Sequence, residues 1–202
     1  HLRAGLDYQT RLVRFLENHD EPRAAATFPP DVHEAAAVIT YLLPGMRFFH
    51  QGQLEGRKKR ISPHLVRAPD EPVNPRPDQL YRRLLGVLCR PVVRQGGWQL
   101  VEPSLAWDGN GTSDCFVAGA WQGAGEQRLL TVVNYVPNQS QCWLRPPFAG
   151  LAGRRWRLKD LLGDAVYERD GDELAGRGLY LDVAPWQYHV FELAPVAGKV
   201  GP

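Results

Sequence analysis

A helix flanked by two short apolar strands is the feature that most constrains the fold of this chain. Apolar residues predict one buried strand at Leu12–Leu16 and another at Met46–His50. Between them, Asp31 and Glu34 resemble the capping box that begins a helix, and Pro44 with the following glycine ends it. A strand, a helix and a strand with a short return form a βαβ unit, so the two strands are expected to pair in parallel.

Beyond Gly96 the sequence pattern becomes purely strand-like. The last predicted helix, with leucines on one face, runs from about Pro77 to Arg90. After it, short runs rich in Val, Trp, Tyr, Phe and Leu are separated by Gly, Pro, Asn and Asp. Strands at this spacing, without helices between them, are typical of an antiparallel β-sandwich. We therefore expect an α/β domain at residues 1–94 and an all-β domain at residues 95–202.

Each apolar run in the second domain is interpreted as one strand. The predicted strands are Trp98–Val101, Cys115–Trp121, Leu129–Val136, Gln141–Leu144, Arg154–Leu158, Val166–Arg169, Leu179–Val183 and Tyr188–Leu193. The only helical turn expected among them is at residues 159–162.

The first strand ends in an unbroken run of polar residues. Glu17, Asn18, His19, Asp20 and Glu21 follow it, and the proline after them stops regular structure. Removing these side chains together from water is costly unless they bind one another or a ligand. The run therefore indicates a polar site at the end of the strand. The alternative is a solvated junction between strand and loop, because polar loop ends are common.

Two stretches of the sequence resemble motifs of one enzyme family. Phe15–Asp20 closely resembles the conserved motif at the seventh barrel strand of the alpha-amylase family of glycoside hydrolases. Pro44–Gln53 is similar to the eighth barrel strand of that family, and the two stretches occur in the family's order. The resemblance covers residues 1–94 well and the remainder only as a general kind of β domain. It implies the C-terminal portion of a (β/α)8 barrel followed by an antiparallel β-sandwich domain.

The resemblance also implies an activity and roles for individual residues. The reaction would be retaining cleavage or transfer at alpha-glucosidic bonds of starch-like or malto-oligosaccharide substrates. No calcium loop is recognisable in this sequence, and we assign no cofactor and no metal site to it. Asp20 would stabilise the transition state and His19 would bind hydroxyls of the same sugar, since groups that grip hydroxyls more tightly in the transition state lower the barrier. Asn18 would orient its neighbours or form a turn. Gln53 would reach the substrate or position its own loop.

Part of the catalytic machinery is not recognisable in this sequence. The family's nucleophilic Asp and acid/base Glu lie on barrel strands four and five, and no stretch here resembles either motif. The resemblance therefore implies an upstream barrel segment, supplied by a longer parent chain or by an associated chain. Two alternatives remain open. One is a free-standing hydrolase that uses Glu17, Asp20 and Glu21, and the other is a non-catalytic carbohydrate-binding or structural module built on the β domain.

Several isolated residues are given structural interpretations. His50 and His64 are expected to be packed or hydrogen-bonded, and the basic cluster Arg57–Arg60 is interpreted as the face of a solvated loop. All six tryptophans lie beyond Gly97 and are expected to fill a core. Stacking of an exposed tryptophan on a sugar ring is the alternative, for which Trp107 is the best candidate.

Charge and cysteine content argue against several classes of function. Lysine and arginine number 24 against 22 acidic residues, a net charge of +2 that does not favour nucleic acid or an anionic membrane as partner. No apolar run approaches the roughly 20 residues of a membrane-spanning helix. Cys89, Cys115 and Cys142 do not form the pattern of a disulfide framework or a zinc site. They are expected to be buried thiols, with a Cys115–Cys142 bridge as the alternative.

Overall fold

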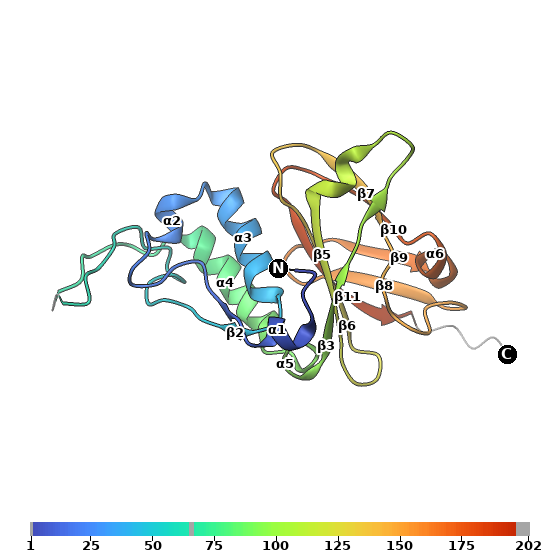
Figure 1. Ribbon diagram of the computed structural model, residues 1–202, viewed down its shortest axis with the longest axis horizontal. Coiled ribbons are helices and arrows are strands. Elements are labelled where there is room, and N and C mark those ends of the chain that lie inside the picture. Colours follow the sequence, from blue (N-terminus) through green and yellow to red (C-terminus); the bar gives the residue numbers. More distant parts are fainter. Residues whose placement is uncertain (1, 65–66, 197–202) are drawn as a thin grey trace. The chain divides into compact units, whose positions relative to one another are not determined.

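The computed structural model describes residues 2–64 and 67–196, and the chain divides into two compact units between Leu88 and Cys89. Helices dominate the first unit and strands the second (Figure 1). The sequence suggested a division after residue 94. The difference concerns helix α5 (Pro91–Gln95), which ends against strand β5 of the second unit. A Cβ atom on Gly96 would lie 2.6 Å from the carbonyl oxygen of Gln122, so the two segments approach closely there.

The first unit contains short strands and longer helices. Its elements are α1 (Leu6–Thr10), β1 (Val13–Arg14), α2 (Ala24–Thr27), α3 (Pro30–Leu42), β2 (Met46–Arg47) and α4 (Pro75–Leu88). Strands β1 and β2 pair in parallel, with Val13 opposite Met46, as the βαβ pattern predicted. Both strands are shorter than predicted, and the apolar residues Phe15 and Phe48 lie just beyond their ends. The short helices α1 and α2 were not predicted.

Helices α3 and α4 lie side by side and bury a common apolar face (Figure 1). Tyr41 of α3 and Tyr81 of α4 are fully buried, and their rings pack edge to face with centroids 6.3 Å apart. The predicted capping box is wrong, because α3 begins at Pro30 and no side chain caps it. Asp31 and Glu34 instead bind the guanidinium of Arg76 at the start of α4.

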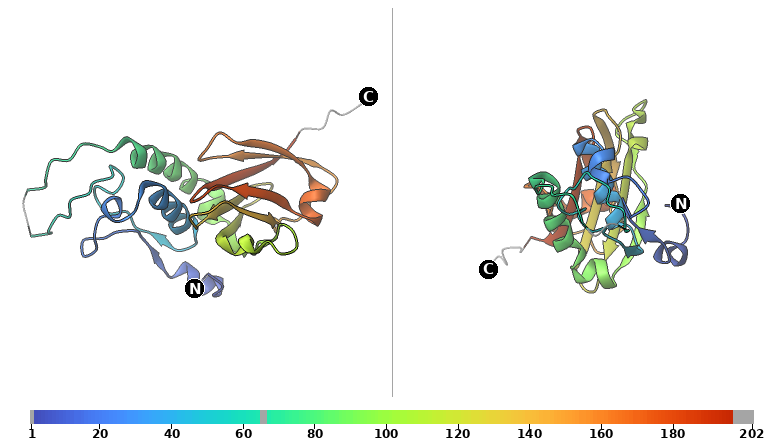
Figure 2. Two further views of the ribbon diagram at one scale, coloured as in Figure 1. Left: turned by 90° about the horizontal axis from the view of Figure 1, so that it is seen from above. Right: turned by 90° about the vertical axis from the view of Figure 1, so that its left-hand side faces the viewer.

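A long connection separates β2 from α4. Its described residues, 48–64 and 67–74, extend away from the two helices as an irregular loop (Figure 2). The predicted basic cluster lies on this loop, and Lys58, Lys59 and Arg60 are exposed, as expected. The Glu71 carboxylate accepts hydrogen bonds from the backbone N–H groups of Lys58 and Lys59, which fixes two parts of the loop together.

The second unit is built from two antiparallel sheets. The six-stranded sheet has the order β3-β5-β6-β11-β8-β9 and the three-stranded sheet the order β10-β7-β4. The strands are β3 (Gly97–Val101), β4 (Ser104–Leu105), β5 (Phe116–Gln122), β6 (Arg128–Asn134), β7 (Ser140–Leu144), β8 (Arg155–Asp160), β9 (Val166–Asp170), β10 (Leu179–Val183) and β11 (Tyr188–Pro195). Each predicted strand is present, and β4 is an addition. The antiparallel arrangement expected from the sequence is thus confirmed.

Helical segments of the second unit differ from the prediction. Residues 159–162 do not form a helical turn, because Lys159 and Asp160 complete β8. A short helix α6 (Gly171–Gly176) follows β9 instead, and the Asp170 side chain caps it by accepting from the N–H groups of Asp172 and Glu173. A 3-10 helix η1 (Gly111–Cys115) precedes β5. No helix in the described part of the chain is long and apolar enough to cross a membrane.

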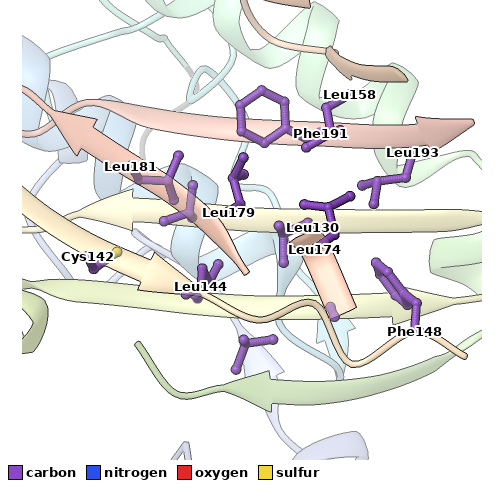
Figure 3. Packing of buried hydrophobic residues seen from close by; sticks show 14 of the residues in the cluster. Leu130, Cys142, Leu144, Phe148, Leu158, Leu174, Leu179, Leu181, Phe191 and Leu193 are labelled. Atoms are coloured by element: carbon purple, nitrogen blue, oxygen red, sulfur yellow. The ribbon is translucent and has the colours of Figure 1, made fainter. Parts of the chain in front are cut away.

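Alternating side chains of the two sheets enclose one apolar core. Figure 3 shows these residues converging from both sheets, with Leu174 of α6 and Phe148 of a loop joining them. The labelled members are Leu130, Cys142, Leu144, Phe148, Leu158, Leu174, Leu179, Leu181, Phe191 and Leu193. Trp156 is fully buried, as predicted for the tryptophans, whereas Trp107 is 55% exposed.

The cysteines follow the prediction only in part. All three are free, so the alternative Cys115–Cys142 bridge is not formed. Cys142 is buried in the core, where desolvation raises the pKa of its thiol to about 12. Cys89 is exposed and Cys115 only partly covered, so the expectation of buried thiols holds for Cys142 alone.

A buried carboxylate of the second unit makes its stability depend on pH. His189 donates from Nδ1 to Asp160 across 2.8 Å, and the N–H groups of Leu162 and Val190 donate to the other carboxylate oxygen. Burial alone would raise the pKa of Asp160, but these bonds outweigh it and lower the pKa. The resulting stabilisation is present above the unfolded-state pKa of about 3.9 and is lost as pH falls through the lower folded-state pKa.

We therefore expect Asp160→Asn to lower the free energy of unfolding of the second unit by roughly 1.5–3 kcal/mol at pH 7. Urea unfolding followed by tryptophan fluorescence measures this unit, because every tryptophan lies in it. The difference between variant and wild type should shrink below about pH 4. A difference that is independent of pH would contradict the role given to the carboxylate charge.

Candidate functional site

Asn18 shapes the loop that follows β1. Its Oδ1 accepts hydrogen bonds from the backbone N–H groups of Asp20 and Glu21, at 2.8 and 2.9 Å. This arrangement is an Asx turn, in which the side chain replaces a backbone acceptor. The turn that the sequence offered as one interpretation of Asn18 is therefore present.

The turn places His19 and Asp20 next to each other at the surface. Nε2 of His19 lies 3.3 Å from Oδ2 of Asp20, and the two side chains are 61% and 75% exposed. Arg60 of the long loop holds this segment from the other side by donating from Nε to the carbonyl oxygen of His19, at 3.2 Å. A side-chain contact as exposed as this one adds little to stability. Both side chains are free to contact a ligand from solvent.

Glu17 has a different environment from its polar neighbours. Its Oε1 lies 3.0 Å from Nη2 of Arg23, and its Oε2 accepts from the N–H of Ala24 at 2.7 Å. Both charged side chains are only 1% exposed. The contact with Arg23 is a charge contact rather than an aligned hydrogen bond. Burial raises the pKa of Glu17, with the Ala24 N–H and the Arg23 charge opposing this effect.

Arg23 joins the loops that follow the two parallel strands. Its Nη1 donates to Nδ1 of His50 at 2.9 Å and to the carbonyl oxygen of Gln51 at 3.0 Å. Its Nε donates to the carbonyl oxygen of Arg57 at 3.3 Å. Since Glu17 and Arg23 stand on either side of the turn that carries His19 and Asp20, their ion pair closes the base of that turn and ties it to the second loop.

Gln53 is the least exposed of the predicted site residues. Its Nε2 donates to the hydroxyls of Tyr41 and Tyr81 at 2.6 and 2.9 Å, and its Oε1 accepts from the N–H of His50 at 3.2 Å. The side chain is 1% exposed. Burial raises the pKa of both tyrosines, that of Tyr41 to about 12, so both phenols stay neutral. The geometry therefore favours the positioning role of Gln53 over direct contact with a ligand.

The structure separates the carboxylates that the sequence places together. Glu17 is committed to Arg23 and Ala24, whereas Asp20 faces solvent. A catalytic set of Glu17, Asp20 and Glu21 would need the first of these to leave a buried ion pair, which is costly. In the described part of the chain, no group of three His, Cys, Asp or Glu side chains could hold a metal ion.

A cavity of about 490 Å³ lies elsewhere in the first unit. It is lined by residues of α2, α3 and the start of α4, together with Lys58, and includes none of the predicted site residues. Glu34 and Arg76 on its wall bind each other.

Sequence reasoning missed the connection between the two loops. It expected His50 to be packed or hydrogen-bonded, but it did not identify Arg23 as the partner. The contact between them spans 27 positions of the chain, and nothing in the local pattern of either loop specifies it. The one available signal was the arginine directly after the proline that ends the polar run.

Comparisons with known proteins find similarity to solved structures at the level of the fold, but no match at the level of sequence. No family model matches the sequence, and no curated protein matches it significantly. Among solved structures, a maltogenic alpha-amylase from Thermotoga neapolitana is similar over 89% of this chain, with 19% sequence identity and a TM-score of 0.67. An alpha-amylase from Geobacillus thermoleovorans, solved with acarbose, is similar over 91% of the chain, with 17% identity and a TM-score of 0.67.

The similarity covers less than half of each of these structures. This chain spans 40% of the Thermotoga structure and 39% of the Geobacillus structure. A trehalose-6-phosphate hydrolase from Bacillus licheniformis is also similar, over 93% of this chain and 45% of its own, with 15% identity and a TM-score of 0.57. The chain therefore has the fold of part of the alpha-amylases, as the resemblance of its two strand motifs predicted.

Proposed function

We propose that this chain is part of a retaining glycoside hydrolase that acts on alpha-glucosidic bonds of starch-like or malto-oligosaccharide substrates. The observation that carries the proposal is the exposed pair His19–Asp20 at the end of β1, in a chain with the fold of part of the alpha-amylases. The carboxylate accepts hydrogen bonds from sugar hydroxyls, and the neighbouring imidazole supplies a second contact to the same ring. Asn18 orients the pair, and Gln53 supports the adjoining loop.

Asp20 acts in the transition state within this proposal. Retaining glycosidases use a nucleophile and an acid/base about 5–5.5 Å apart, with an oxocarbenium-like transition state between them. A third carboxylate that binds the reacting sugar more tightly as its ring distorts lowers the barrier without forming a covalent bond. The exposure and fixed backbone of Asp20 suit this role. The nucleophile and the acid/base come from elsewhere.

Exposed apolar side chains support a further barrel segment. Val13, Phe15, Met46 and Phe48 belong to β1, β2 and the residues just after them, and their exposed fractions range from 38% for Phe48 to 61% for Met46. Parallel sheets are normally covered on both faces. We infer that β1 and β2 are the last strands of a (β/α)8 barrel whose other strands, from the parent chain or an associated chain, cover these residues. Residues 95–202 are then the C-terminal β-sandwich domain.

One observation favours the alternative of a non-catalytic carbohydrate-binding module. Trp107 is 55% exposed, and Tyr180 is 41% exposed beside Trp143, with ring centroids 5.3 Å apart. Exposed aromatic rings with an apolar face and a polar edge are suited to a surface that binds sugar rings. In this alternative the second unit binds glucan and no bond is cleaved.

Hydrolysis of soluble starch tests the proposal. We term the complete natural polypeptide that carries this sequence the parent polypeptide. We expect it to release reducing sugar, and acarbose, the ligand of the Geobacillus structure, to inhibit it. The separately expressed 202-residue chain should release none. A parent polypeptide that binds acarbose without any release would favour the binding module, and release by the 202-residue chain alone would contradict the need for an upstream segment.

A further inference from the structure

His50 lies just beyond β2, on the strand that pairs with β1. Its Nδ1 is 2.9 Å from Nη1 of Arg23. The guanidinium remains protonated at any ordinary pH and can only donate, so Nδ1 must be the acceptor. The neutral ring then carries its proton on Nε2, which fixes one tautomer. The backbone N–H of His50 donates to Gln53, so main chain and ring are both held.

The second ring nitrogen of His50 is available to a ligand. Nε2 makes no hydrogen bond within residues 2–64 and 67–196, and it is absent from the buried polar atoms that lack a partner there, so it reaches the surface. The side chain is 21% exposed. Its ring stacks on Phe48, with centroids 6.5 Å apart and an interplanar angle of 17°. The Nε2–H group is thus the accessible hydrogen-bond donor of a ring that is otherwise mostly covered.

Burial and nearby charges favour the neutral form of His50. Desolvation lowers the pKa of His50, and the nearby charges of Arg23 and His19 lower it further. His19 is thus close enough to act on it electrostatically. Oε1 of Glu17, the nearest carboxylate among the described residues, is 3.7 Å from Nδ1, beyond hydrogen-bond reach, and is already engaged by Arg23.

We propose that His50 is a further ligand-binding residue of the His19–Asp20 site, where its Nε2–H donates a hydrogen bond to an oxygen of a bound sugar. The ligand class follows from the chemistry of the site, which offers a carboxylate acceptor and imidazole donors beside the exposed ring of Phe48. A sugar hydroxyl can donate to the carboxylate and accept from an imidazole, whereas a simple anion would be repelled by the Asp20 carboxylate. Arg23 acts as a positioning residue that fixes the tautomer. The inference deepens the proposed function and depends on it.

Two substitutions at position 50 separate ligand binding from structural support. In His50→Asn, the shorter amide offers Arg23 an acceptor near the place of Nδ1 but cannot reach as far as Nε2. In His50→Gln, the longer amide places an N–H near Nε2 but offers no acceptor to Arg23. We expect His50→Asn to weaken acarbose binding by the parent polypeptide about five- to tenfold, and His50→Gln to weaken it no more than about twofold. Stability should follow the opposite order, with the glutamine variant unfolding at the lower urea concentration.

Isothermal titration with acarbose, with His19→Ala as the reference variant, decides between the outcomes. If His19→Ala weakens binding and His50→Asn does not, His50 is not a ligand-binding residue, while the proposed function stands. If affinity follows stability, His50 has only a structural role. If the wild type does not bind acarbose, the proposed function fails and this inference with it.

Nitrogen-15 NMR of labelled histidine should also show the Nε2–H tautomer of His50, and a proton on Nδ1 instead would overturn the assignment.

Discussion

Asp20→Ala in the parent polypeptide is expected to lower the turnover of soluble starch by about 10²- to 10³-fold, the cost of removing one group that stabilises transition-state charge. Substrate affinity should change much less, because the carboxylate contributes more to the distorted ring than to the ground state. Asp20 is 75% exposed and, within residues 2–64 and 67–196, its carboxylate contacts only an exposed imidazole, so its removal should leave the fold intact. Initial rates over a range of starch concentrations separate the two kinetic constants.

The neighbouring residue supplies a matched control for this prediction. Glu21 is also an exposed carboxylate, and its backbone N–H also donates to Asn18 in the same turn. Glu21→Ala should therefore retain nearly the full turnover. If Asp20→Ala turns over starch as fast as the wild type, Asp20 has no part in the chemistry. Equal losses in both variants would indicate a general effect of loop charge.

Arg23→Met is expected to lower the free energy of unfolding of the first unit by about 3–5 kcal/mol, because it leaves the Glu17 charge buried without its partner. Both side chains are 1% exposed, and Arg23 also supports His50, Gln51 and Arg57. A loss of this size is a large part of the stability of an ordinary domain. We also expect the loss of the Arg23 side chain to make the turn that carries His19 and Asp20 mobile.

Hydrogen exchange measured by mass spectrometry locates this effect. Protection should fall in α2 and in the loops on either side of Arg23, and should be unchanged in the strands of the second unit. Arg11→Met is the control, because Arg11 forms an exposed ion pair with Asp7 and should be nearly neutral. If Arg23→Met does not fold, the double variant Glu17→Leu, Arg23→Met should recover much of the loss. A double variant no more stable than Arg23→Met would contradict the importance of the unpaired charge.

Sequence patterns were most informative where burial alone decides the structure. Strands β8 and β10 alternate buried and exposed residues, as in β8, where Trp156, Leu158 and Asp160 point inward, and all residues of β6 are buried, so the positions of these strands were predictable. Short elements such as α2, α6 and β4 have too few residues to show a period. The capping box failed for a different reason. Helix α3 begins at Pro30, so Asp31 lies inside its first turn, and the Asp31 side chain binds Arg76, 45 positions away in the chain.

The candidate site was predictable in its location and not in its internal arrangement. The unbroken polar run after β1 marked the position, and a resemblance named the roles of His19 and Asp20. Local sequence could not show that Glu17 turns inward while Asp20 turns outward, because this depends on Arg23 and on the loop after β2. For the same reason it could not show that Arg23 binds the ring of His50.

The crystal structure of the parent polypeptide with acarbose is the most direct test of the central claim. His19 and Asp20 are expected to bind the same sugar ring, with the Asp20 carboxylate within hydrogen-bond distance of its hydroxyl groups. An acarbose molecule bound away from both side chains, with no cleft beside them, would contradict the proposed glycosidase site.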